Sequence, residues 1–109
     1  MGEIDELIKK IVKFRDDRNW AQFHNGKDLA ICLNVEAAEL LELFLWKSDK
    51  EVNINDLQDE LADIIYSALL IAHQYNMDVK EIMLSKLKKN ELKYPVYKAK
   101  NSRKKYTEL

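Results

Sequence analysis

The chain has 109 residues, a formal net charge of −1, two glycines, one proline and one cysteine. Scarce Gly and Pro argue against a turn-rich β-sheet fold, and the abundant Leu, Ile and Ala favour one all-α domain over residues 1–109. The sequence has no charge-free apolar run of membrane length, and the single Cys32 excludes an internal disulfide or a cysteine-based zinc site. We therefore expect a cytoplasmic protein that does not act at a membrane.

The charges are distributed unevenly along the chain. Residues 1–78 contain 8 Lys or Arg against 16 Asp or Glu, whereas residues 79–109 contain 10 against 3. A nucleic acid polymer is not an expected partner, because the acidic part would repel its phosphates. Two interpretations fit: an acidic bundle with a solvated basic tail, or a site that uses acids to hold cations and bases to hold an anionic substrate.

Apolar residues with helical spacing predict the first two helices. Residues 4–18 carry an i, i+3, i+4, i+7 stripe and should form an amphipathic helix. The following segment, NWAQFHNGKD, breaks the period, and its Asn25-Gly26 pair is typical of a turn. Asp28 is the expected N-cap of the second helix, which should end near Trp46.

Two more helices and a tail complete the predicted architecture. The third helix should start near Asn55 and end at about Tyr75, and the fourth should cover residues 79–93, with Asp78 as its N-cap and Pro95 beyond its end. The remaining segment, PVYKAKNSRKKYTEL, has no clean period and should be an irregular basic tail. Because the second and third helices are apolar over most of their circumference, we expect a second copy of the chain to cover part of them.

The second and third helices each carry a row of acids within apolar surface. Acids three or four residues apart share one face of a helix. Two facing rows of carboxylates repel each other at neutral pH, and Mg²⁺ or Mn²⁺ would relieve that repulsion. Solvated helix faces also carry acids at this spacing, so the pattern alone leaves both interpretations open. The rows consist of Glu36, Glu39 and Glu42 in the second helix and Asp56, Glu60 and Asp63 in the third.

The motif E-x-x-E followed by E-x-x-D resembles the signature of the MazG-type all-α nucleotide pyrophosphohydrolases. The segments RDDRNWAQFHNGKDLAICLNVEAAELLELFLWK and DELADIIYSALLIA, with the ending RKKYTEL, are similar to the dCTP pyrophosphatase branch of that superfamily. The resemblance covers almost the whole chain. It implies a four-helix MazG-like bundle completed by oligomerisation, as a homodimer or a tetramer built from two dimers, with an irregular basic C-terminal tail.

The resemblance also implies a reaction. Enzymes of this kind hydrolyse a nucleoside triphosphate between the α- and β-phosphates, giving a monophosphate and pyrophosphate. The expected role is that of a house-cleaning enzyme of the dNTP pool. Mg²⁺ would be the cofactor, with Mn²⁺ as a possible substitute. By resemblance the metal ligands would be Glu36, Glu39, Glu60 and Asp63, and either Glu36 or Glu39 would accept the proton of the attacking water.

Further residues match family positions near the substrate. Two tryptophans resemble the aromatic wall of the base pocket, a lysine and an asparagine four residues apart on the fourth helix match positions near the phosphates, and three bases of the tail would close over the polyphosphate of the same or a neighbouring subunit. Core packing, an exposed helix face and an exposed tail are the alternatives for these residues. The predicted substrate-binding residues are Trp20, Trp46, His24, Lys86, Asn90, Arg103, Lys104 and Lys105.

Two positions depart from the dCTP-selective pattern. Ile11 stands where those relatives carry a His, and Ser67 stands where they carry a Tyr, with Tyr66 displaced by one residue. The metal chemistry is therefore better supported than a preference for cytosine. A di-iron carboxylate bundle is not expected, because neither histidine follows an acid by three residues. The non-enzymatic alternative is a helical dimerisation or regulatory module.

Overall fold

The computed structural model describes residues 2–109 and divides the chain into two compact units, Met1–Met77 and Asp78–Leu109. Every regular element within residues 2–109 is helical, so the all-α class predicted from composition is confirmed. Over the same residues, the helices are too short or too polar to cross a bilayer.

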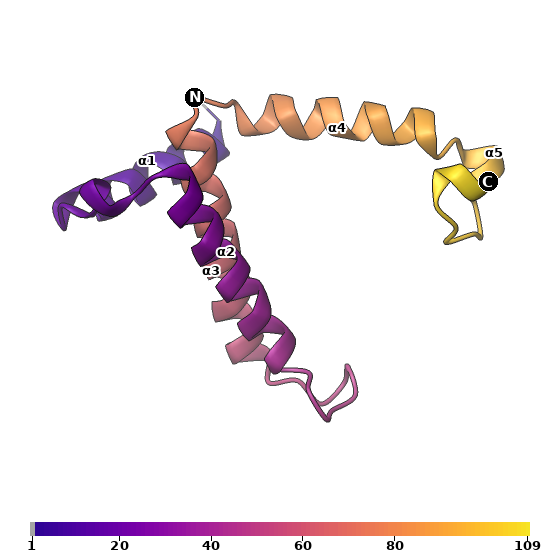
Figure 1. The fold of residues 1–109 in the computed structure, drawn as a ribbon, viewed down its shortest axis with the longest axis horizontal. Coiled ribbons are helices and arrows are strands. Elements are labelled where there is room, and N and C mark those ends of the chain that lie inside the picture. The colour runs from indigo at the N-terminus through magenta and orange to yellow at the C-terminus, as the bar shows by residue number, and fades with distance from the viewer. Residues whose placement is uncertain (1) are drawn as a thin grey trace. The chain divides into compact units, whose positions relative to one another are not determined.

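The first unit is built from three long helices and one short 3₁₀ turn. Helix α1 spans Glu3–Asp17, the 3₁₀ turn η1 spans Trp20–Phe23, α2 spans Gly26–Glu42 and α3 spans Ile54–Gln74. Helices α2 and α3 lie side by side as an antiparallel hairpin, and α1 packs against α3 (Figure 1). The hairpin thereby brings the two acid-bearing helices next to each other.

The start and the end of α2 differ from the prediction. Asn25, not Asp28, is the N-cap, and its side-chain oxygen accepts a 2.8 Å hydrogen bond from the backbone N–H of Asp28. The Asn-Gly pair therefore opens a helix instead of forming a turn, since Asn is among the preferred N-cap residues. The helix ends at Glu42, earlier than predicted, and Trp46 adopts a left-handed backbone conformation with φ of 63° in the connection that follows.

Helix α3 agrees closely with the prediction. It begins at Ile54 after Asn53, whose side chain accepts a hydrogen bond of 3.1 Å from the backbone N–H of Asp56. It ends at Gln74, and Asn76 follows in a left-handed conformation with φ of 55°. Asn tolerates this conformation well, so it is suited to the end of a helix.

The hydrophobic core of the first unit is small. The buried apolar residues are Leu29 of α2 and Leu69, Leu70 and Ala72 of α3, and Leu70 is only 1 % exposed. Many other large apolar side chains of α1, α2 and α3 are exposed by more than a third of their surface. The chain by itself therefore buries only part of the apolar surface that its sequence provides.

Shortening Leu70 to alanine is expected to destabilise the protein by about 2–5 kcal/mol, because the cavity left at this fully buried site would be only partly filled by relaxation. Urea denaturation followed by circular dichroism measures the change. The matched control is Leu70→Met, which keeps the volume and should cost less than about 1.5 kcal/mol. Equal losses in the two variants would contradict a packed site at Leu70.

The second unit begins with α4, which spans Val79–Lys93. Its N-cap is Asp78, as predicted, and the carboxylate of Asp78 accepts a 2.9 Å hydrogen bond from the backbone N–H of Glu81. The helix ends before Tyr94 and Pro95, also as predicted, because a residue that precedes proline is unfavourable in a helix.

The basic tail is more ordered than its sequence predicts. A short helix α5 spans Val96–Ala99, and a 3₁₀ turn η2 spans Tyr106–Glu108. The ring of Tyr106 packs edge-on against that of Tyr94, with 6.0 Å between the centroids. The Nζ of Lys93 lies 4.8 Å from the centroid of the Tyr106 ring. Aromatic and cation–π contacts of this kind, which carry no sequence period, hold the tail against the end of α4.

Candidate metal and nucleotide site

Three carboxylates converge between the two helices of the hairpin. Each of Glu36 on α2 and Glu60 and Asp63 on α3 offers one oxygen, and these oxygens lie within 4.8 Å of one another. Glu60 and Asp63 share a face because they are three residues apart in a helix. Glu36 and Glu60 are half-buried, whereas Asp63 is exposed. The structure thus brings together three of the four acids predicted as metal ligands.

Crowding and burial change the acidity of this cluster. Burial, together with the neighbouring carboxylates of Glu60, Glu39 and Asp63, raises the pKa of Glu36 from 4.5 to about 7. Burial also raises the pKa of Glu60; the adjacent Glu36 carboxyl lowers it in part, and repulsion from Glu39 and Asp63 adds to the rise. Full ionisation of the cluster at neutral pH is therefore unfavourable, because the surroundings are apolar and the acids repel one another.

The stability of the metal-free protein is expected to fall as the pH rises from about 4.5 to about 7. In this range the Glu36 carboxyl is already deprotonated in the unfolded chain but still protonated in the folded one, so the unfolded state binds fewer protons. Thermal unfolding in the presence of a chelator measures the effect. Glu36→Gln should flatten this part of the profile, and an unchanged slope in that variant would show that the effect arises elsewhere.

The cluster fits a divalent cation. The Oε2 atoms of Glu36 and Glu60 are buried, and no donor within the described residues 2–109 hydrogen-bonds to either of them. Buried acceptors without partners are costly, and a cation would satisfy them and offset the repulsion together. Carboxylate oxygens are hard ligands, which suit Mg²⁺ and Mn²⁺ better than soft transition metals.

The other acids of the two rows lie at the edge of this cluster or outside it. Glu39, the fourth predicted ligand, is half-buried and close enough to raise the pKa of Glu36 and Glu60, but it does not share the 4.8 Å cluster. Glu42 is exposed at the end of α2. Glu39 therefore remains a predicted ligand that lies next to the three converging acids.

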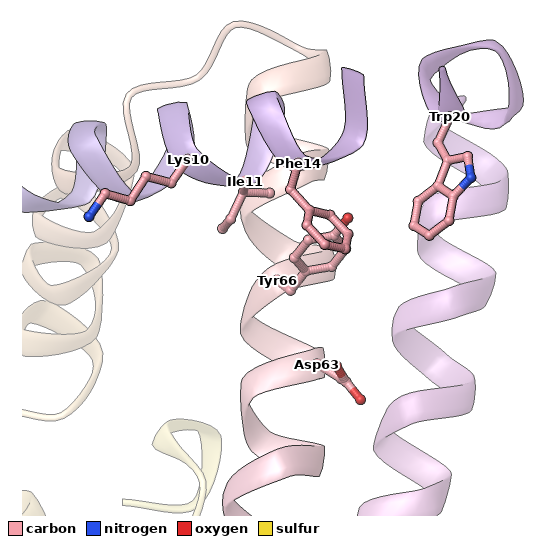
Figure 2. A pocket seen from close by; sticks show the side chains of 6 residues that line it. All are labelled: Lys10, Ile11, Phe14, Trp20, Asp63 and Tyr66. Carbon is pink, nitrogen blue, oxygen red and sulfur yellow. The ribbon is translucent and has the colours of Figure 1, made fainter. Parts of the chain in front are cut away.

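A pocket of about 500 Å³ adjoins the cluster and shares Asp63 with it (Figure 2). The rings of Phe14 and Trp20 lie edge to face with 5.8 Å between their centroids, and those of Phe14 and Tyr66 with 6.4 Å. Figure 2 shows the Phe14 and Tyr66 rings next to each other and Trp20 across from them. The pocket is lined by Lys10, Ile11, Phe14, Trp20, Asp63 and Tyr66.

The structure separates the two predicted tryptophans. Trp20 lines the pocket, whereas Trp46 is 100 % exposed in the connection after α2. The two residues flank a helix of 17 residues, which is about 25 Å long. They do not line one pocket within a single chain. His24 is half-buried, and no donor or acceptor within residues 2–109 pairs with its Nδ1. Burial lowers the pKa of His24, and the positive charge of Arg15 lowers it further.

The remaining predicted substrate-binding residues belong to the second unit. Lys86 lies on an exposed face of α4, where it lines a shallow pocket with Glu81 and Lys89 among others. Asn90 is half-buried on the same helix. The three bases of the tail, Arg103, Lys104 and Lys105, are exposed.

Sequence reasoning missed two residues beside the acids. Tyr66, treated as a displaced residue, lines the pocket, whereas its neighbour Ser67 is 6 % exposed and belongs to the core. Phe14, which lies within the amphipathic helix predicted for residues 4–18, is the centre of the aromatic cluster. The signal that would have found Tyr66 is its i+3 spacing from Asp63, which places both on one face of α3.

Comparison with known proteins decides the family. The family model described as MazG-like matches residues 31–109. This chain belongs to the MazG-like family. Among its relatives, dCTP pyrophosphatase 1 from Homo sapiens is 33 % identical over 114 residues, which cover 97 % of this chain and 67 % of that protein. The protein of the same name from Mus musculus is 32 % identical with the same coverage.

The fold of this MazG-like protein is also similar to that of a solved structure. A pyrophosphatase from Archaeoglobus fulgidus superposes with a TM-score of 0.80 and 32 % sequence identity, over 87 % of this chain and 94 % of that one. The chain therefore lies in the dCTP pyrophosphatase branch of the MazG-like enzymes. It is a nucleoside triphosphate diphosphatase, and the alternative of a non-catalytic module is set aside.

Proposed function

We propose that this protein hydrolyses nucleoside triphosphates, preferably dNTPs, between the α- and β-phosphates with the help of Mg²⁺, releasing a monophosphate and pyrophosphate. The observation that carries the proposal is the convergence of Glu36, Glu60 and Asp63 within 4.8 Å beside an aromatic pocket. Carboxylates and an apolar, flat-walled pocket are the two features that a metal–nucleotide complex requires. A role in cleaning the dNTP pool and a cytoplasmic location remain predictions.

The acids would hold the cation together with the phosphates. Glu36, Glu60 and Asp63 would be the ligands, with Glu39 joining them after a small adjustment of its side chain. When bound, Mg²⁺ would neutralise phosphate charge and make water more acidic. Mn²⁺ has similar ligand preferences and is a possible substitute. Glu36 or Glu39 would accept the proton of the attacking water. Glu36 belongs to the cluster, and its raised pKa makes it a competent base near neutral pH, whereas Glu39 lies at the edge of the cluster.

The aromatic pocket would hold the base. Trp20 offers a flat face for stacking, and its position in the pocket with Asp63 places it beside the acids. Trp46 would line the same kind of pocket only in a second copy of the chain, since one helix length separates it from Trp20. Other predicted contacts to the substrate could come from the same subunit or from a neighbouring one. These residues are His24, Lys86, Asn90, Arg103, Lys104 and Lys105.

We further propose that residues 1–109 act as one MazG-like domain within a homodimer or a tetramer built from two dimers. The support is the number of large apolar side chains that α2 and α3 leave exposed, because contiguous exposed apolar surface is typical of sites of association. A second copy would cover this surface and would bring its Trp46 and basic residues to a shared site.

The test of the activity is a nucleotide panel with product identification. The protein is stripped of metal with a chelator and assayed with each dNTP and NTP before and after Mg²⁺ is restored. The proposal predicts monophosphate and pyrophosphate only when metal is present. Turnover that persists undiminished in the chelator would contradict the role of the cation, and turnover of no nucleotide at all would contradict the proposed reaction.

A further inference from the structure

Asn25 and Gly26 form the only Asn-Gly pair of the sequence. The side-chain amide of asparagine is chemically labile, because the backbone nitrogen of the next residue can attack its Cγ atom. Glycine in that next position has no side chain to hinder the attack and leaves the backbone free to rotate. Every other asparagine of the chain precedes a larger residue. The sequence therefore singles out Asn25 as the most reactive amide of the chain.

The start of α2 both favours and opposes this reaction. Asn25 is exposed, and the N–H of Gly26 belongs to the first turn of the helix, where N–H groups have no partner within the helix. The positive end of the helix dipole stabilises the nitrogen anion that attacks. The N-cap opposes ring closure, because the Asn25 side chain accepts a 2.8 Å hydrogen bond from the Asp28 N–H and donates one of 2.8 Å to the Asp28 carboxylate. The reaction therefore requires the cap to open.

Packing against α3 accounts for the glycine in this pair. Gly26 does not have a positive φ, so its backbone conformation does not require a glycine. A Cβ atom at this position would instead overlap the hydroxyl group and the ring of Tyr75, the C-cap residue of α3. The contact between the two ends of the hairpin thus places the least hindering residue directly after Asn25.

We propose that Asn25 is a site of spontaneous deamidation, which proceeds when the α2 cap opens and which then prevents the cap from forming normally. The deprotonated Gly26 nitrogen bonds to the Asn25 Cγ, ammonia leaves, and a five-membered succinimide results. One water molecule then opens either carbonyl of the ring, giving aspartate or isoaspartate. Aspartate places a second carboxylate beside that of Asp28, where the amide had donated a hydrogen bond. Isoaspartate adds a methylene group to the backbone and displaces the capping oxygen.

The modified residue lies next to a wall of the pocket along the chain. Trp20 lines the pocket from η1, and only His24 separates the end of η1 from Asn25. A weakened cap leaves the direction in which η1 joins α2 less well fixed. We therefore expect deamidated protein to have a higher KM for nucleotide than fresh protein. This consequence rests on the proposed function, whereas the modification itself does not.

The test follows the mass of one tryptic peptide from the full chain. Trypsin releases residues 19–27 as a single peptide, which contains Asn25 and also Asn19, an internal control followed by a bulky residue. Folded protein is incubated in warm, mildly alkaline buffer, and the peptide is sequenced by mass spectrometry at intervals. We expect conversion of amide to acid at Asn25, with a separately eluting isoaspartate form, and none at Asn19. In urea the conversion at Asn25 should be about 5-fold faster, because no cap opposes it.

The matched control variant is Asn25→Ser, since serine also caps helices but has no amide to lose. It should keep its initial KM throughout the incubation, while the KM of the wild type rises. An intact Asn25 in folded protein after full conversion in urea would overturn the proposal, and so would equal rates in the two conditions. A KM that rises equally in Asn25→Ser would contradict the effect on the pocket. The peptide mass does not depend on turnover, so a protein that hydrolyses no nucleotide would contradict the proposed function while the deamidation is still measured.

Discussion

Replacing Glu36 with glutamine is expected to lower kcat/KM for nucleotide hydrolysis by roughly 1000-fold. Glu36 contributes the only carboxylate of α2 to the three-acid cluster found within residues 2–109, so the amide leaves the cation held from α3 alone. A bound metal supplies several kcal/mol of charge stabilisation in hydrolysis, and each 1.36 kcal/mol corresponds to a factor of ten in rate. Initial rates of monophosphate release at saturating Mg²⁺ measure the loss.

The matched control for this variant is Glu42→Gln. Glu42 lies on the same helix and undergoes the same chemical change, but it is exposed and outside the cluster. Its activity should remain near that of the wild type. Thermal unfolding adds a second readout: Mg²⁺ should raise the melting temperature of the wild type and of Glu42→Gln, but have little effect on Glu36→Gln. Similar activities for the two variants would contradict a metal site at Glu36.

The purified protein is expected to migrate as a dimer or a tetramer at micromolar concentration. Large apolar side chains remain exposed along both helices of the hairpin, including Ile31 and Val35 on α2 and Leu61 and Ile65 on α3. These residues form i, i+4 pairs, so each pair makes a continuous apolar stripe on one helix face. Exposed stripes of this kind are typical of surfaces that associate. Size-exclusion chromatography with light scattering measures the mass.

A charge placed in the stripe should disrupt this association. Ile31→Glu adds a carboxylate at a position that is 52 % exposed in the single chain, and we expect a shift towards the monomer together with loss of activity. Ala37→Glu, an equally acidic change at an exposed position that lies roughly 120° or more around α2 from Ile31 and Val35, should keep the wild-type mass. A wild-type protein that is monomeric and active would contradict the expectation that a second copy completes the site.

The helices follow from local patterns, and most of them could be predicted. Asp78 caps α4 and Pro95 limits it, because capping and proline geometry act within a few residues. The start of α2 was predicted less well, since Asn25 and Asp28 are both good caps and the sequence does not decide between them. The choice of Asn25 leaves Asp28 in the first turn, where a negative charge is favourable.

The acid cluster was predicted from the resemblance of the E-x-x-E and E-x-x-D motifs to the MazG-type signature, since helix spacing alone left a solvated face as an alternative. Three of the four acids that the resemblance implies, Glu36, Glu60 and Asp63, converge in the structure. The difference between Glu39 and these three depends on how α2 rotates against α3, which is a property of packing. The sequence carries no local signal for that rotation.

The pocket was less predictable for the same reason. Whether Tyr66 or Ser67 enters it depends on a rotation of about 100° about the axis of α3, and contact with α1 decides the outcome. Phe14 of α1 meets Tyr66, so Tyr66 lies in the pocket and Ser67 in the core. Resemblance in sequence did not predict the location of Trp46. A tryptophan matches the family at this position, but within a single chain it lies far from Trp20.

The most direct test of the account is to identify the bond that breaks. The wild-type protein is incubated with a dNTP and Mg²⁺ in ¹⁸O-labelled water, and ³¹P NMR identifies the products and locates the label. The account predicts monophosphate and pyrophosphate as the products of a single cleavage at the α–β bond. Formation of a diphosphate and orthophosphate would contradict it.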